Sequence, residues 1–128
     1  MSVYWIDGGC KPGPVAYGSI CEEWLDPTRE LEGLGPESRI MTFQLPQAKT
    51  NNEAEYHTLL TLLHHAKLSE SDWIFTDSAL LVGHLTQGWR VGATNLRPLY
   101  VEAATLLAAC GAKLRKVDRR EIVRKVGH

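Results

Sequence analysis

The segment from Thr50 to Ala66 constrains the fold most, because it has the pattern of an amphipathic helix with a defined start. Thr50 and Glu53 have the spacing of a capping box, in which a hydroxyl and a carboxylate cap backbone amides. The apolar residues that follow at helical spacing are Leu59, Leu62, Leu63 and Ala66. We therefore predict a helix from about residue 50 to 67. Glu55 falls on its core-facing stripe, where a carboxylate must be paired, bound to a metal ion or placed at the rim of the core.

The composition is that of one globular domain over residues 1–128. Hydrophobic residues make up 44% of the chain and charged residues 23%, which excludes a disordered protein. No apolar run approaches the roughly 18 residues of a membrane helix, and the N-terminus lacks the basic region of a signal peptide. Cys10, Cys21 and Cys110 are odd in number and widely spaced, so we expect free thiols in a reducing cytoplasm. We also expect a monomer without a membrane partner.

The distribution of charge gives a weaker indication. The net charge is −1, yet seven cationic side chains lie between residues 113 and 125. A basic segment of this kind is compatible with binding to a polyanion. A solvated charged face explains it at least as well, so charge alone does not decide between these interpretations.

Three segments before the helix are predicted strands, and the short connections between them indicate an antiparallel meander. They span residues 3–6, 15–24 and 39–45, with a polar loop over 25–37. After the helix, strands over 72–76 and 113–117 alternate with helices over 79–85 and 96–109, and a final short helix is expected around Ile122–Val126. Gly111 is the expected stop of the 96–109 helix. The predicted fold class is α/β, with a mixed five-stranded sheet of three antiparallel strands followed by parallel strands, flanked by helices.

Asp7 and Asp77 occupy equivalent places, because each is predicted to end an apolar strand in the centre of the sheet. Sites in open α/β sheets lie outside the carboxyl ends of the strands, and Glu55 reaches the same rim from the first turn of the long helix. Three converging carboxylates repel one another unless they are protonated or share cations. Oxygen ligands suit Mg²⁺ or Mn²⁺ rather than zinc. The sequence therefore predicts a divalent metal site built from these three residues.

Three segments resemble the signature segments of type 1 ribonuclease H, in the right order and at fitting separations. They are Asp7-Gly8-Gly9, Thr50-Asn51-Asn52 with Glu55, and Phe75-Thr76-Asp77-Ser78. Residues 87–100 are similar to the compact archaeal and bacterial branch of that family, which lacks a basic protrusion between these helices. The resemblance covers nearly the whole chain and implies a ribonuclease H-like fold.

The resemblance also implies a metal-dependent endonuclease that hydrolyses the RNA strand of an RNA/DNA hybrid. Asp7 would bridge two divalent cations, with Glu55 and Asp77 completing the sites. One cation would help to generate the attacking hydroxide and the other would stabilise the leaving 3′ oxygen, which gives 5′-phosphate and 3′-hydroxyl products. Glu55 would also accept a hydrogen bond from a ribose 2′-OH. The positions implied to contact substrate are Gly8, Gly9, Cys10, Thr50, Asn51 and Asn52.

The chain departs from the family pattern at the fourth metal ligand. The Asp that the family carries in an Asn-x-x-Ala-Asp setting is absent, and His128 lies nearest to its position, which implies His128 as a catalytic and metal-binding residue. A second alignment makes Gly127-His128 the mobile His loop of the family. Glu121 and the terminal carboxylate are further candidates for the fourth ligand. Lys11 also replaces an Asn that is usual in the first loop.

A second functional class therefore stays open, namely a hybrid-binding or RNA-binding module of the same fold that has lost efficient catalysis. A related nuclease that prefers double-stranded RNA is open as well, because both substrates present an A-form minor groove with 2′-OH groups. Cleavage with Mg²⁺ or Mn²⁺ would separate an enzyme from a binding module. Because the basic protrusion is missing, we expect modest and salt-sensitive substrate affinity.

Overall fold

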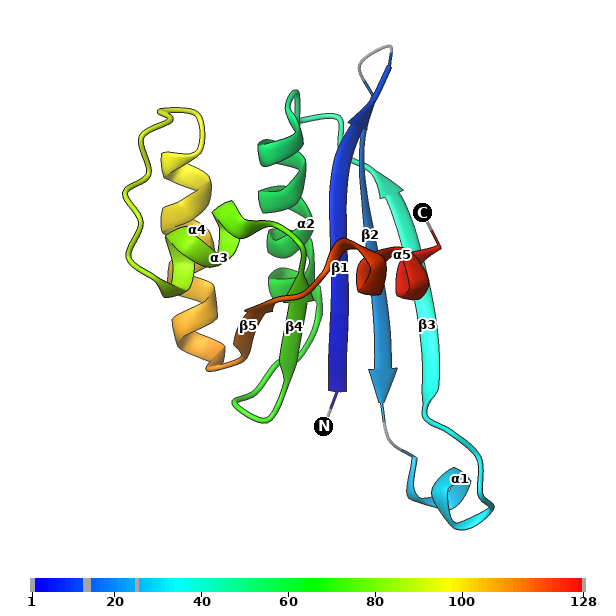
Figure 1. Ribbon diagram of the computed structural model, residues 1–128. Helices are drawn as coiled ribbons and strands as arrows, with labels where there is room; N and C mark the ends of the chain where they lie inside the picture. Colours follow the sequence, from blue (N-terminus) through cyan, green and yellow to red (C-terminus); the bar gives the residue numbers. More distant parts are fainter. Residues whose placement is uncertain (1, 13–14, 25, 128) are drawn as a thin grey trace.

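A five-stranded mixed sheet forms the centre of the computed structural model, which describes residues 2–12, 15–24 and 26–127 (Figure 1). The strands are β1 (Ser2–Lys11), β2 (Val15–Trp24), β3 (Glu37–Gln44), β4 (Trp73–Thr76) and β5 (Lys113–Lys116). They lie in the order β3-β2-β1-β4-β5. The β1–β2 and β2–β3 pairs are antiparallel, whereas the β1–β4 and β4–β5 pairs are parallel. The predicted mixed sheet is confirmed.

β1 is longer than predicted, and Asp7 lies inside it rather than at its end. β2 pairs with β1 over all ten residues, so the strand continues through the two glycines. The parallel pairing with β4 stops earlier, at Trp5 opposite Phe75. Asp7 and Asp77 thus each follow the last parallel pair by two residues. The expected strand end at Asp7 is wrong, but the expected equivalence of the two aspartates is confirmed.

The described residues form five helices, and four of them cover the two faces of the sheet. They are α1 (Pro27–Leu31), α2 (Asn51–His65), α3 (Ala79–Thr86), α4 (Arg97–Cys110) and α5 (Arg119–Val126). Side chains alternate between the two faces of a strand, so Ile6 packs in the cluster that contains α2 and α4, whereas Trp5 packs against Ile122 and Val126 of α5. α5 contacts β1 and β2, and Figure 1 shows it in front of the sheet, with α2, α3 and α4 grouped together away from it and α1 beyond the ends of β2 and β3.

Two helices differ from the sequence prediction. α1 lies in the predicted polar loop, because the Asp26 side chain caps it and Pro27 occupies its first position. α5 begins at Arg119, three residues before the predicted Ile122, because the Asp118 carboxylate accepts the backbone N–H of Arg120. The other helices, and all strands except β1, start and end within two residues of the predicted bounds. The early start of α5 places Arg119 at the rim of the sheet.

The core confirms the predicted apolar stripes. The stripe of α4 packs in the main hydrophobic cluster together with that of α2, and its residues are Leu96, Leu99, Tyr100, Ala103, Leu106, Leu107 and Cys110. Gly111 ends α4 with a φ of 76°, a left-handed conformation that glycine adopts without steric cost. The three cysteines are free thiols, as expected. Within the described ranges, no helix combines the length and apolarity needed to cross a membrane.

Candidate metal centre

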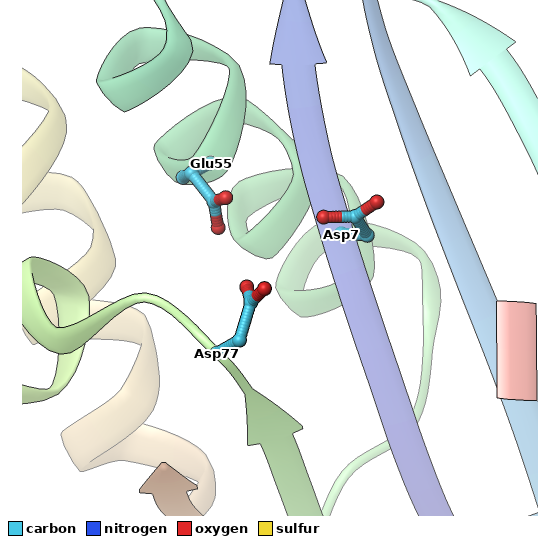
Figure 2. Close-up of side chains that lie close together, drawn as sticks. All are labelled: Asp7, Glu55 and Asp77. Carbon is cyan, nitrogen blue, oxygen red and sulfur yellow. The ribbon is translucent and has the colours of Figure 1, made fainter. Parts of the chain in front are cut away.

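Asp7, Glu55 and Asp77 converge at one rim of the sheet, although they come from three separate elements. Asp7 lies in β1, Glu55 in the second turn of α2, and Asp77 directly after β4. One carboxylate oxygen of each residue lies within 4.8 Å of one carboxylate oxygen of each of the other two. Figure 2 shows the three side chains pointing toward a common space between the strands and α2. The convergence predicted from the sequence is therefore present in the fold.

Gly8 allows α2 to approach β1 closely enough to bring Glu55 beside Asp7. A Cβ atom at Gly8 would lie 2.5 Å from the carbonyl oxygen of Ala54, a distance that no side chain tolerates. A hydrogen bond also joins β1 and α2, in which the backbone N–H of Cys10 donates to Oδ1 of Asn51 at 2.7 Å. The backbone of β1 therefore packs directly on the first turn of α2.

The start of α2 is fixed by its cap. The hydroxyl of Thr50 accepts the backbone N–H of Glu53 at 3.1 Å, as the capping box requires. The Glu53 carboxylate accepts the N–H of Lys49 at 3.1 Å. The Glu53 carboxylate therefore caps the N–H of Lys49, whereas a standard capping box would have it cap the N–H of Thr50. A fixed helix start determines which residue of the first turns faces β1, and that residue is Glu55.

The carboxylates of this cluster are poorly satisfied by the protein itself. Asp7 is 1% exposed. Within the part of the chain that the structure describes, the buried oxygens Asp7 Oδ2 and Glu55 Oε2 have no hydrogen-bond partner. A buried acceptor without a partner is costly, so both atoms are suited to ligating a cation. An all-oxygen donor set of this kind fits Mg²⁺ or Mn²⁺.

The same environment changes the protonation of Glu55. Burial, and after it the negative charges of Asp77 and Asp7, together raise the pKa of Glu55 from 4.5 to about 8. Arg119 and the backbone N–H of Gly8 act in the opposite sense. At neutral pH, Glu55 is therefore mainly protonated while no divalent ion is bound. Such a perturbation is common at functional sites.

Arg119 is the residue of this site that sequence reasoning missed. Its Nη1 donates to Oδ1 of Asp7 at 2.7 Å and to Oδ2 of Asp77 at 3.0 Å. These hydrogen bonds, led by the one to Asp7, raise the pKa of Arg119 above its ordinary value, so the guanidinium stays charged. No signal in the sequence singled it out, because the role of Asp118 as the helix cap that orients Arg119 is evident only in the fold.

Tyr17 is a second residue near the three carboxylates that no sequence pattern predicted. It lies opposite Gly9 in the β1–β2 ladder, and a Cβ atom at Gly9 would lie 3.1 Å from its hydroxyl. Burial raises the pKa of Tyr17, the charge of Asp7 adds to the rise, and Arg119 counteracts it. The phenol therefore belongs to the electrostatic surroundings of the three carboxylates.

The predicted substrate positions lie at the same rim. Gly8, Gly9 and Cys10 continue β1 beyond Asp7, and an exposed surface at the start of α2 consists of Thr50, Asn51 and Asn52. The hydrogen bond between Cys10 and Asn51 joins the two groups. Gly8 and Gly9 are buried, so the accessible part of the edge that the two groups form consists of Cys10, Thr50, Asn51 and Asn52.

The fourth ligand is not identified among the described residues. His128, the predicted candidate, lies outside them, and so does the terminal carboxylate. Glu121 lies in α5, where its carboxylate pairs with Arg124. Over the described ranges, the cluster of metal-ligating side chains contains Asp7, Glu55 and Asp77 alone.

Comparison with known proteins points to one fold. No model of a known protein family matches the chain. The chain is 35% identical over 104 residues to the bifunctional protein Rv2228c of Mycobacterium tuberculosis, an alignment that covers 78% of this chain and 26% of that protein. It therefore spans roughly a quarter of the length of the curated relatives that it matches.

Solved structures extend the similarity to nearly the whole chain. RNase H1 from the archaeon Halobacterium salinarum has a TM-score of 0.71 at 21% identity, covering 98% of this chain and 91% of that one. The N-terminal RNase H domain of Rv2228c has a TM-score of 0.68 at 22% identity, covering 98% and 90%. LC11-RNase H1, solved in complex with an RNA/DNA hybrid, has a TM-score of 0.66 at 17% identity, covering 98% and 91%. The predicted ribonuclease H-like fold is confirmed.

Proposed function

We propose that this chain, which has the fold of type 1 ribonuclease H, is a metal-dependent endonuclease that hydrolyses the RNA strand of RNA/DNA hybrids. The observation that carries the proposal is the carboxylate cluster of Asp7, Glu55 and Asp77, two of whose oxygens are buried without a partner among the described residues. The similarity to Rv2228c, part of which is named an RNase H domain, supports it. The hybrid seen with LC11-RNase H1 supports the choice of substrate.

The cofactor of this proposal is a pair of Mg²⁺ or Mn²⁺ ions. Asp7, Glu55 and Asp77 would hold them, with Asp7 shared between the two. Divalent ions in such a site supply Lewis-acid activation of water and stabilise charge on the leaving oxygen. The expected products are a 5′-phosphate and a 3′-hydroxyl.

The protein itself would hold and orient the substrate. Asp7 and Asp77 each lie two residues beyond the last parallel strand pair, so the sheet sets the spacing of their backbones. Glu55 comes from the α2 side and would accept a hydrogen bond from a ribose 2′-OH, which would distinguish RNA from DNA. The edge formed by Gly8, Gly9, Cys10, Thr50, Asn51 and Asn52 would contact the hybrid, with Thr50 near a phosphate of the DNA strand. We propose that residues 1–128 act as one monomeric domain in a reducing cytoplasm.

A labelled RNA/DNA hybrid tests the proposal. The intact chain, Asp7→Asn and the matched control Asp26→Asn are incubated with Mg²⁺ and separately with Mn²⁺. Asp26 caps α1, and asparagine also caps helices, so this control preserves the fold. We expect cleavage by the intact chain and by Asp26→Asn, with 5′-phosphate ends on the products. Asp7→Asn should lose cleavage while still unfolding in one cooperative thermal transition.

A binding module without efficient catalysis is the second candidate. It is favoured by the ion pairs of Arg119 with two of the three carboxylates and by the lack of a fourth carboxylate in the cluster over the described ranges. If the intact chain binds the hybrid but cleaves it with neither ion, this second function replaces the first. Double-stranded RNA in the same assay decides whether the enzyme prefers that substrate.

A further inference from the structure

One nitrogen atom of Arg119 lies between the two aspartates of the candidate metal centre. Nη1 contacts Asp7 at 2.7 Å and Asp77 at 3.0 Å, so a single positive group serves both carboxylates. We propose that Arg119 is a displaceable counter-cation, which neutralises Asp7 and Asp77 in the metal-free protein and must leave when a divalent ion binds. This inference rests on the proposed metal-dependent function.

The guanidinium and a divalent ion compete for the same oxygens. A bound Mg²⁺ lies about 2.1 Å from each carboxylate oxygen that ligates it. If it used Oδ1 of Asp7 while Arg119 stayed in place, the two cations would lie less than about 5 Å apart, because both would contact one atom. Cations at that separation in a partly buried site repel strongly. Metal binding and the Arg119 contacts are therefore mutually unfavourable.

Arg119 is the partner that can move. Its side chain is 49% exposed, whereas those of Asp7 and Asp77 are 2% and 16% exposed. The aspartates are held by the sheet, while Arg119 is the first residue of α5. An open hollow of about 560 Å³ beside it gives the long side chain room to swing away, and it is lined by Asp77, Lys116, Val117, Asp118 and Arg119 itself.

A permanent ion pair is the competing explanation, and it predicts different behaviour. A permanent pair would stabilise the protein equally with and without metal, so by linkage its loss would leave metal binding unchanged. A displaceable cation stabilises only the metal-free protein. Its removal therefore lowers the stability of that form and, by linkage, strengthens metal binding by the corresponding factor.

Calorimetric titration with Mn²⁺, without any nucleic acid, distinguishes a displaceable cation from a permanent ion pair. The proteins are the intact chain, Arg119→Gln and the matched control Arg120→Gln. Arg120 is the next residue of α5 and pairs with Asp118 on the surface, so this control removes the same charge without touching the cluster. We expect the dissociation constant of Arg119→Gln to fall by roughly tenfold, the factor that about 1.4 kcal/mol produces. Arg120→Gln should bind Mn²⁺ as the intact chain does.

Thermal unfolding gives an independent readout. Arg119→Gln should melt at a lower temperature than the intact chain in a metal chelator, and the difference should vanish at saturating Mn²⁺. An unchanged or weaker affinity of Arg119→Gln, or a difference in melting temperature that persists with Mn²⁺, would overturn the inference. If the intact chain nevertheless cleaves the hybrid, only the role of Arg119 fails. If neither the intact chain nor Arg119→Gln binds Mn²⁺ and no hybrid is cleaved, the proposed function fails as well.

Discussion

The raised pKa of Glu55 predicts how the stability of the metal-free protein depends on pH. Its pKa of about 8 in the folded protein lies above the value of 4.5 expected for the unfolded chain. Between these two values the unfolded chain has released a proton that the folded protein still holds. The free energy of unfolding therefore falls as pH rises through this window, since the folded state binds more protons.

The magnitude follows from the proton difference. One proton corresponds to about 1.4 kcal/mol for each pH unit. Between pH 5.5 and 7.5 Glu55 should therefore remove about 2 to 3 kcal/mol of stability, a large fraction of the 5–15 kcal/mol typical of a domain. Glu55→Gln has nearly the same shape without the titrating proton, so it should lack this loss.

Urea unfolding in a metal chelator at pH 5.5 and 7.5 measures the effect. The useful quantity is the stability of Glu55→Gln minus that of the intact chain, because other groups titrate equally in both proteins. We expect this difference to grow by about 2 kcal/mol between the two pH values. Glu32→Gln, at an exposed position outside the carboxylate cluster, is the control for the loss of one carboxylate. A difference that is the same at both pH values would refute the argument from burial and neighbouring charge.

Two further predictions concern the same site. Gly8→Ala should destabilise the protein by about 1 to 3 kcal/mol in thermal unfolding, because the new Cβ would meet the Ala54 carbonyl at 2.5 Å. Gly92→Ala, where an added Cβ has no neighbour within 4 Å, should leave the melting temperature nearly unchanged. Mn²⁺ binding at pH 6.5 should release close to one proton from Glu55, seen as a binding enthalpy that changes with the ionisation enthalpy of the buffer. Proton release that is equal in Glu55→Gln would contradict this assignment.

The carboxylate cluster was predictable because each member follows from a local pattern. Asp77 follows a short apolar strand, and Glu55 follows a helix cap at a fixed distance. The error at Asp7 shows the limit of this reasoning. Gly8 and Gly9 read as a turn in the sequence, but β2 pairs with them and keeps them in the strand. The position of Asp7 was still correct, because it depends on where the parallel pairing with β4 ends.

Arg119 could not be predicted from local patterns. It is one of seven cations in a short basic segment, and nothing in the sequence distinguishes it from Arg120. In the fold, Arg119 contacts the cluster while Arg120 turns back to Asp118. This difference arises from the residue at which α5 begins, and the sequence prediction placed that start three residues too late. A side chain that reaches a site across the sheet depends on tertiary geometry at the level of a single helical position.

Glu55 and Arg119 together explain how three carboxylates can lie so close in the metal-free protein. Three ionised carboxylates within 4.8 Å would repel one another strongly. The proton on Glu55 removes one negative charge, and the guanidinium of Arg119 balances much of the remaining two. A divalent ion has to replace both of these positive charges. Raising the pH and removing Arg119 should therefore each strengthen metal binding. Because both changes act on one cluster, their combined effect should differ from the sum of the separate effects.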